Sequence, residues 1–379
     1  MPDLESQVFT SIDDIDPALW NSMLQPGEFL ASHDFVRACE KAGIGGAEFR
    51  YVLVFERGCL IGSAALFNMR VGLDLLAAGL TRSFFDVMRR VNPSLASVSV
   101  VFCGLPVSLG TSCVRLAHGH SHDGATSLIT AVMKDFAEDS GAGFLCFKEF
   151  GEQESRALGP ALTTEGFTRA SSLPGCSVDI RWPDRTQYAD ALRSGYRRQL
   201  QLDRQAMRES GLEFAVGQGL LPDLATVHQL YSLVMARAQN KMEILPVAFF
   251  SELEKAAPGK LWSVVAHYEG RPVANAIVLW DKPVCYFLLA GLDYAHLGET
   301  HTYQNLVSEV IGTAISLGAS HLELGQTSYA LKGRLGGKTT SRDIWLRHLE
   351  PLRNRLLAAA APLLFHEVRP PVRHVFRRE

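Results

Sequence analysis

The chain has 379 residues, of which 47% are hydrophobic and 20% are charged, and its formal net charge is −3. These values are typical of a globular protein with room for two domains. They exclude a strongly basic chain that binds nucleic acid over its whole surface, so we expect no DNA partner. The seven cysteines are scattered without a C-x-x-C pair, which favours reduced thiols. The first residues lack the apolar core of a signal peptide, and no run approaches the ~20 apolar residues of a membrane span. We therefore expect a cytoplasmic protein without a transmembrane segment.

The first half of the chain carries helical patterns followed by strand patterns. Residues 13–42 predict two helices, with Asp16 and Ser32 as N-caps. Two apolar runs within 51–69, joined by Glu56-Arg57-Gly58, predict a β-hairpin. The remaining predicted elements are strands at 97–102, 113–116 and 144–147, a helix at 126–139, a helix end at 162–166 and a closing strand at 176–182.

The second half repeats this order. A long helix is predicted over 188–210, and a hairpin over 261–280 turns at Glu269-Gly270-Arg271. The other predicted elements are strands at 212–216, 284–290, 321–324 and 343–348, with helices at 226–240, 246–256 and 302–317. A hairpin, a strand, a helix and two strands thus occur twice, at 51–182 and 261–349, which predicts two related domains in tandem.

This order resembles the Gcn5-related N-acyltransferase (GNAT) fold, and the tandem pair resembles the FemAB-like and BioF2-like acyltransferases of bacteria. The matching stretches are SGYRRQLQLDRQAMRESGLEF (194–214), LWSVVAHYEGRPVANAIVLW (261–280) and LGASHLELGQTSYALKGRLGG (317–337). The resemblance implies an α/β (α+β) fold of two GNAT-like domains, each a mixed, mostly antiparallel sheet flanked by helices. It implies a non-catalytic domain at 1–183 that shapes the acceptor cleft, a domain with the active site at 184–350, and a basic tail at 351–379.

The activity that the resemblance implies is N-acyl transfer. An acyl or aminoacyl group would pass from an activated donor to an amine of a small molecule, an amino acid or a cell-envelope precursor. Acyl-CoA is the favoured co-substrate, and no tightly bound cofactor is expected. Members that use acyl-CoA carry a Gln/Arg-x-x-Gly-x-Gly/Ala loop, which residues 118–126 and 295–305 do not match. Aminoacyl-tRNA therefore stays open as the donor, and a binding protein without turnover stays open as the alternative to an enzyme.

Amine acylation needs a neutral amine, a polarised carbonyl and a protonated leaving group. Glu323, at the end of a predicted strand, is the expected base acting through water, and Tyr329 is the expected acid. Alternatively, Glu323 is a carboxylate paired with a neighbouring basic residue, and Tyr329 only forms a wall of the pocket. In the polar loop 325–338, Lys332 and Arg334 are expected to bind a phosphate or carboxylate of the donor, together with Gln326. A solvated loop is the alternative.

Further polar residues fall on the predicted helices. His301 and Asn305, four positions apart, are expected to line the donor pocket, with Tyr303 on the acceptor side. Arg197, in an arginine-rich helix, could meet an anionic partner such as tRNA or cofactor phosphates, and Arg237 and Lys241 could extend that patch. For His301, Tyr303 and Asn305 the alternative is a capped helix start with polar flanks. For the basic residues the alternative is an ordinary solvated face.

Two segments carry weaker signals. His118, His120 and His122 alternate, but no second ligand cluster accompanies them, so we predict a loop and no metal. The tail 351–379 is basic, with an apolar stretch at 356–365. Packing as a terminal helix on the body is favoured, and peripheral contact with an anionic membrane surface is the alternative.

Overall fold

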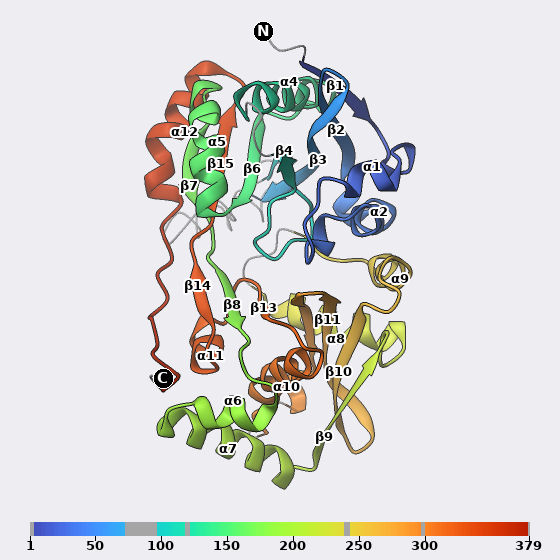
Figure 1. Ribbon diagram of the computed structural model, residues 1–379, viewed down its shortest axis with the longest axis vertical. Helices are drawn as coiled ribbons and strands as arrows, with labels where there is room; N and C mark the ends of the chain where they lie inside the picture. Colours follow the sequence, from blue (N-terminus) through green and yellow to red (C-terminus); the bar gives the residue numbers. More distant parts are fainter. Residues whose placement is uncertain (1–3, 73–96, 118–121, 239–242, 297–299, 378–379) are drawn as a thin grey trace.

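The computed structural model describes residues 4–72, 97–117, 122–238, 243–296 and 300–377. In this part of the chain two mixed sheets lie one above the other in Figure 1, and helices flank each of them. The strands are β1 (Leu4–Phe9), β2 (Glu48–Glu56), β3 (Cys59–Gly72), β4 (Ser97–Cys103), β5 (Val114–Leu116), β6 (Phe144–Phe150), β7 (Thr168–Ser171), β8 (Gly175–Asp179), β9 (Leu212–Gln218), β10 (Leu261–Tyr268), β11 (Arg271–Asp281), β12 (Val284–Leu292), β13 (His321–Glu323), β14 (Lys338–Thr340) and β15 (Asp343–His348). The helices are α1 (Pro17–Asn21), α2 (His33–Lys41), α4 (His122–Ser140), α5 (Glu152–Thr164), α6 (Arg185–Ala191), α7 (Ser194–Glu209), α8 (Leu224–Arg237), α9 (Val247–Ala256), α10 (Thr302–Ser316), α11 (Tyr329–Arg334) and α12 (Pro351–Leu364).

The predicted fold class is confirmed. The first sheet has the order β1-β2-β3-β4-β6-β15-β7, with β5 beside β3, and the second has the order β14-β8-β13-β12-β11-β10-β9. Among the described strand pairs, β4 with β6 and β12 with β13 are parallel, and the others are antiparallel. Each parallel pair is connected through a helix, α4 in the first sheet and α10 in the second, as parallel neighbours require.

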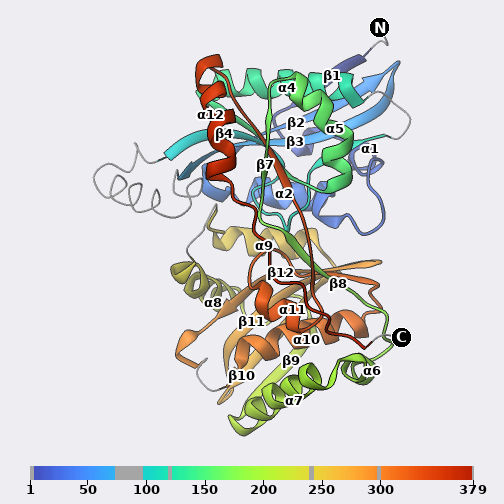
Figure 2. The same ribbon diagram turned by 90° about the vertical axis from the view of Figure 1, so that its left-hand side faces the viewer.

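The two sheets exchange a strand. β8 precedes residue 184 in the sequence but lies in the second sheet, between β13 and β14. β15 follows residue 184 but lies in the first sheet, between β6 and β7. The strand predicted at 176–182 to close the first half is therefore an interior strand of the second sheet. Sheet membership does not follow the predicted division at 183/184, and Figure 2 shows β8 descending from the upper sheet to the lower one.

Both predicted hairpins are present, and their turns explain why. Arg57 and Gly58 have φ values of 50° and 77°, and Glu269 and Gly270 have 49° and 74°. Two successive residues with positive φ make the turn that matches the twist of antiparallel strands. The turn residues thus hold β2 against β3 and β10 against β11.

The helix predicted over 188–210 is two helices, which corrects that prediction. Leu192 and Arg193 are extended between α6 and α7. Leu192 is fully buried and pairs with Phe376, while the Arg193 amide donates to the oxygen of Val375 at 2.9 Å. The backbone groups that a continuous helix would pair internally thus pair with the carboxyl-terminal segment instead. Helical periodicity cannot predict such a long-range contact.

One hydrophobic core joins the two halves. It runs from the first sheet through α2 and α9 to one face of the second sheet, where it includes Ile277, Tyr286 and Leu288. The Tyr286 hydroxyl donates a hydrogen bond to the Gly27 oxygen across this junction. Separate cores cover the outer faces of the first sheet, beneath α4 and α5, and of the second sheet, beneath α6, α7 and α10.

Candidate active site

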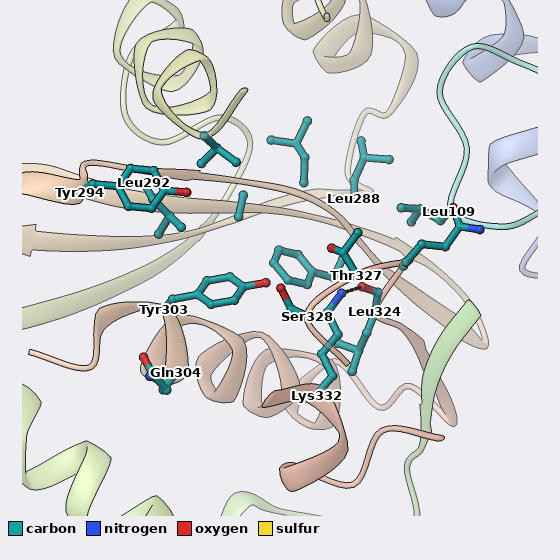
Figure 3. A pocket seen from close by; sticks show the side chains of 16 residues that line it. Leu109, Leu288, Leu292, Tyr294, Tyr303, Gln304, Leu324, Thr327, Ser328 and Lys332 are labelled. Atoms are coloured by element: carbon teal, nitrogen blue, oxygen red, sulfur yellow. Dashed lines mark hydrogen bonds between the residues drawn. The ribbon is translucent and has the colours of Figure 1, made fainter. Parts of the chain in front are cut away.

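A cavity of about 550 Å³ opens where β12 and β13 separate. The two strands pair from Val284 and His321 to Tyr286 and Glu323, and the cavity begins beyond that point. Its walls come from β12, the start of α10, the segment after β13, α8 and a loop of the first half (Figure 3). The lining residues are Leu109, Val234, Phe287, Leu288, Leu289, Ala290, Leu292, Tyr294, Tyr303, Gln304, Leu324, Gly325, Gln326, Thr327, Ser328 and Lys332.

A β-bulge in β12 faces this space. Ile277 pairs with Leu289, but the next residue of β11, Val278, pairs with Phe287. Leu288 is therefore the extra residue, and a bulged residue leaves the regular ladder of backbone hydrogen bonds. Because β13 has already diverged, the backbone of β12 at this point can donate hydrogen bonds to a bound molecule.

The segment after β13 is strained where it meets the cavity. Thr327 and Ser328 have φ values of 95° and 52°, a region that costs a β-branched residue most. Gly325 has φ of 70°, and a Cβ there would lie 3.1 Å from Leu109 Cδ2. Non-glycine residues held at positive φ are frequent at ligand sites, which agrees with their position on the cavity wall.

Lys332 is the cation of the cavity. It lies on α11, so the region predicted as a loop contains a short helix, and its side chain is only 3% exposed. Its Nζ donates a hydrogen bond to the Leu324 oxygen at 2.6 Å. Burial lowers the pKa of this amine from its ordinary 10.5 to about 8, because the charged form has lost its water.

Two tyrosines occupy the side of the cavity nearest α10. The Tyr303 hydroxyl points across the cavity toward Ser328 in Figure 3. Burial raises the pKa of Tyr303, and a hydrogen bond with Ser328 partly opposes that rise. The ring of Tyr294 lies 4.0 Å beneath the guanidinium carbon of Arg237, which brings this predicted substrate-binding residue to the cavity's edge.

Glu323 lies next to the cavity but does not line it. Its Oε1 is 3.0 Å from Nε2 of His321, and Nδ1 of His321 is 3.3 Å from Asp179 Oδ1. The other oxygen, Oε2, is buried without a hydrogen-bond partner among the described residues. A buried carboxylate oxygen without a partner is costly, so this oxygen can accept a hydrogen bond from a water molecule or a ligand.

Gln326 and Tyr329 fasten the segment between them to the chain before β8. Gln326 Nε2 donates to the Leu173 oxygen at 2.7 Å, and the Tyr329 hydroxyl donates to the Pro174 oxygen at 2.8 Å. Gln326 lines the cavity. Tyr329 does not, and burial raises the pKa of its hydroxyl.

The first turn of α10 is held by a carboxylate. Asp203 Oδ1 lies 2.6 Å from His301 Nδ1, and Asn305 Nδ2 donates to the main-chain oxygen of Asp203 at 2.8 Å. His301 and Asn305 thus tie α10 to α7 and do not line the cavity. A buried carboxylate beside a helix N-terminus also disfavours a phosphate there, because both groups are negative.

The remaining predicted residues lie apart from the cavity or outside the described part of the chain. Arg197 lies 3.5 Å from Asp190, and Arg334 is exposed in the last turn of α11. Lys241, His118 and His120 lie outside the described residues, while His122 begins α4. Among the described residues no group of three His, Cys, Asp or Glu side chains is placed to hold a metal ion.

Sequence reasoning missed most of the cavity wall. The pattern of 284–290 predicts only a strand and no cavity wall, and Leu109 and Val234 come from distant parts of the chain. The sequence does contain one signal for the site. Thr327 and Ser328 follow a glycine that ends a strand, and polar side chains at strand ends often bind ligands.

Comparisons with known proteins agree with this geometry. Residues 193–333 match the family model described as an acetyltransferase (GNAT) domain. "Putative 8-amino-7-oxononanoate synthase 2" of Mycobacterium tuberculosis is 22% identical over 346 residues, which cover 89% of this chain and 44% of that protein. The chain thus spans less than half the length of this curated relative.

Two solved structures show the same fold. FemX matches with a TM-score of 0.55 and 11% identity, over 93% of this chain and 100% of FemX. A tandem GNAT protein from the clavulanic acid biosynthesis pathway matches with a TM-score of 0.57 and 12% identity, over 92% of this chain and 99% of that one. The matching model identifies residues 193–333 as a GNAT domain, which agrees with the separated parallel strands of the second sheet. Most of the chain shares the fold of FemX and of this tandem GNAT protein.

Proposed function

We propose that the chain transfers an acyl group from an activated thioester, with acyl-CoA as the favoured donor, to the nitrogen of an amine acceptor. The observation that carries this proposal is the cavity between β12 and β13, which combines an apolar wall, a bulged strand and one buried lysine. An apolar, water-poor site makes hydrogen bonds to a developing oxyanion more effective. The acceptor belongs to the broad class of small amines, amino acids and cell-envelope precursors.

The charges in the cavity favour an acyl group over an aminoacyl group. None of the described residues that line it is an aspartate or a glutamate, and Lys332 supplies a positive charge. The ammonium of an aminoacyl group would be desolvated beside a like charge, which is costly at low dielectric. A neutral acyl thioester carries no charge that Lys332 would repel.

The chemistry can be assigned to four groups. The amine nitrogen attacks the thioester carbon, and the Leu288 amide and the Lys332 ammonium stabilise the oxyanion that forms. Glu323 accepts the proton of the amine through water, and the tetrahedral intermediate collapses with cleavage of the C–S bond. The Tyr303 hydroxyl protonates the departing thiolate and recovers a proton from solvent. Tyr329 positions the strained segment through its bond to Pro174.

Aminoacyl-tRNA-dependent transfer is the second candidate. It is favoured by one observation: the carboxylate of Asp203, on α7, contacts His301 at the N-terminus of α10, where acyl-CoA enzymes of this fold hold a pyrophosphate. Of the basic residues predicted to meet such phosphates, Arg197 and Arg237 lie in the described part of the chain.

A calorimetric titration with CoA and acyl-CoAs, coupled to an assay of thiol release with a panel of amines, tests the proposal. We expect saturable binding and amine-dependent thiol release. Lys332→Met should slow thiol release at least about a hundredfold, whereas Lys338→Met, which removes an exposed lysine of β14, should leave it unchanged. Consumption of aminoacyl-tRNA with no response to any thioester would support the second candidate. Binding without turnover of any donor would mean that the chain is a binding protein.

A further inference from the structure

Helix α12 is apolar on two opposite faces. Its inner face packs against β15 and β7, with Leu357 and Phe365 against the core and Ala361 buried. Asn354 fixes it further, because its Oδ1 accepts from the His348 amide and its Nδ2 donates to the Gly166 oxygen, both at 2.9 Å. The helix is therefore docked firmly on the first sheet, as predicted for the tail, and Figure 2 shows it on the outside of the molecule.

The outer face carries three exposed leucines in a stripe. Leu352, Leu356 and Leu363 are 70%, 63% and 73% exposed. With 3.6 residues per turn they fall within about 40° of one another around the helix axis. A single exposed leucine is ordinary, but an apolar stripe opposite a face that is already packed normally has a partner of its own.

Positive charge flanks this stripe. Arg353 and Arg355 project about 80° to either side of it. Arg353 lies 3.1 Å from Glu350, but both side chains are largely exposed, so the pair leaves the arginine free to reorient. Residues 350–379 hold six arginines against three glutamates, whereas the rest of the chain holds 31 basic and 37 acidic residues. The leucine stripe thus lies on a positively charged segment of a chain that is otherwise net negative.

We propose that the outer face of α12 docks on the surface of an anionic lipid bilayer, with the helix lying in the plane of the headgroups. Leucines that enter the acyl boundary between flanking arginines that reach the phosphates are the arrangement of an interfacial helix. No helix in the described chain is long and apolar enough to cross a membrane, so the contact is peripheral. A second copy fits less well, because a stable dimer buries about 800 Å² per partner and uses about 20 residues a side.

Sedimentation with lipid vesicles tests this inference. The probes are vesicles of phosphatidylcholine alone and of phosphatidylcholine with an equal amount of phosphatidylglycerol. We expect binding to the anionic vesicles, weakened at least about tenfold by neutral lipid or by high salt. The variant Leu352→Ser/Leu356→Ser/Leu363→Ser should lose at least about tenfold in vesicle affinity while keeping its thermal midpoint.

Matched controls keep the outcome decisive. Leu202→Ser/Leu233→Ser removes two exposed leucines of α7 and α8 and should bind vesicles as the unchanged protein does. Equal binding by the α12 variant, or no binding by the unchanged protein, overturns the proposal. A dimer that is seen by light scattering without lipid, and is lost in the α12 variant, would assign the stripe to a second copy instead. The stripe shares no residue with the cavity, so these outcomes are independent of the proposed transfer reaction.

Discussion

Lys332 and Leu324 are joined by a hydrogen bond of 2.6 Å, from the lysine Nζ to the main-chain oxygen of the residue that follows β13. The bond holds a buried ammonium at the point where β13 turns away from β12. Replacing Lys332 by Met should lower kcat/KM by at least about a hundredfold if the ammonium stabilises the oxyanion. It should also reduce the free energy of unfolding by about 1–3 kcal/mol, because the Leu324 oxygen loses its partner. Steady-state kinetics and urea unfolding measure both, and activity equal to that of Lys338→Met would refute the assignment.

The same lysine predicts a pH dependence. Because burial lowers its pKa to about 8, the amine loses its charge as the pH rises through that value. We expect kcat/KM to fall on the alkaline side of about pH 8 and this limb to be absent from the residual activity of Lys332→Met. Stability should respond in the opposite sense. The folded state binds fewer protons than the unfolded state between the two pKa values, so this group makes the protein more stable as pH rises from about 8 to 10.5.

His321 predicts a second pH effect, this one on stability. Its hydrogen bond to Glu323, opposed by burial and assisted by Asp179, raises its pKa above 6.5. The stabilisation that protonated His321 gives the fold is fully present below the pKa of this residue in the unfolded chain. It is lost as the pH rises through the pKa in the folded protein. His321→Gln should therefore reduce the free energy of unfolding by about 1 kcal/mol at about pH 6 and by less at about pH 8. Denaturant unfolding at both pH values measures this, with His374→Gln as the exposed control. A difference that grows with pH would contradict the prediction.

Gly325 and Gly318 form a matched pair for testing the cavity wall. Both have φ near 70°, but a Cβ on Gly325 would lie 3.1 Å from Leu109 whereas a Cβ on Gly318 meets nothing within 4 Å. Each Gly→Ala change should cost about 1–2 kcal/mol of stability from backbone strain. Only Gly325→Ala should also weaken donor binding, because Leu109 must move. Thermal unfolding and calorimetry separate the two effects, and equal donor affinities would show that Leu109 does not shape the bound donor.

The two tyrosines of the site should behave differently. Burial raises the pKa of Tyr303, so its hydroxyl keeps a proton to donate at neutral pH. Tyr303→Phe should lower kcat at least about tenfold while the donor Kd stays the same. Tyr329→Phe removes the bond to Pro174 and should mainly cost about 1 kcal/mol of stability. A large loss of kcat in Tyr329→Phe, with none in Tyr303→Phe, would reverse the two roles.

Local elements were predictable from the sequence, and long-range ones were not. Residues 56–58 and 269–271 specify both hairpins through their own turn preferences, and the apolar pattern of 302–317 predicts α10. The partners of β8 and β15 depend on contacts far apart in the sequence, which periodicity does not encode. The same reason explains Leu192, whose extended backbone is set by pairing with Phe376. In the candidate site, Lys332, Gln326 and Tyr303 were named from their positions, whereas Leu109 and the bulge at Leu288 required the packed structure.

The exchange of β8 and β15 restricts how such a protein can evolve by recombination. Each strand lies inside the sheet of the other half, so a crossover near residue 184 that replaced one half would leave both sheets with a mismatched interior strand. We therefore expect recombination between relatives to keep the two halves together. The sequences of β8 and β15 should vary together with those of the sheets in which they lie.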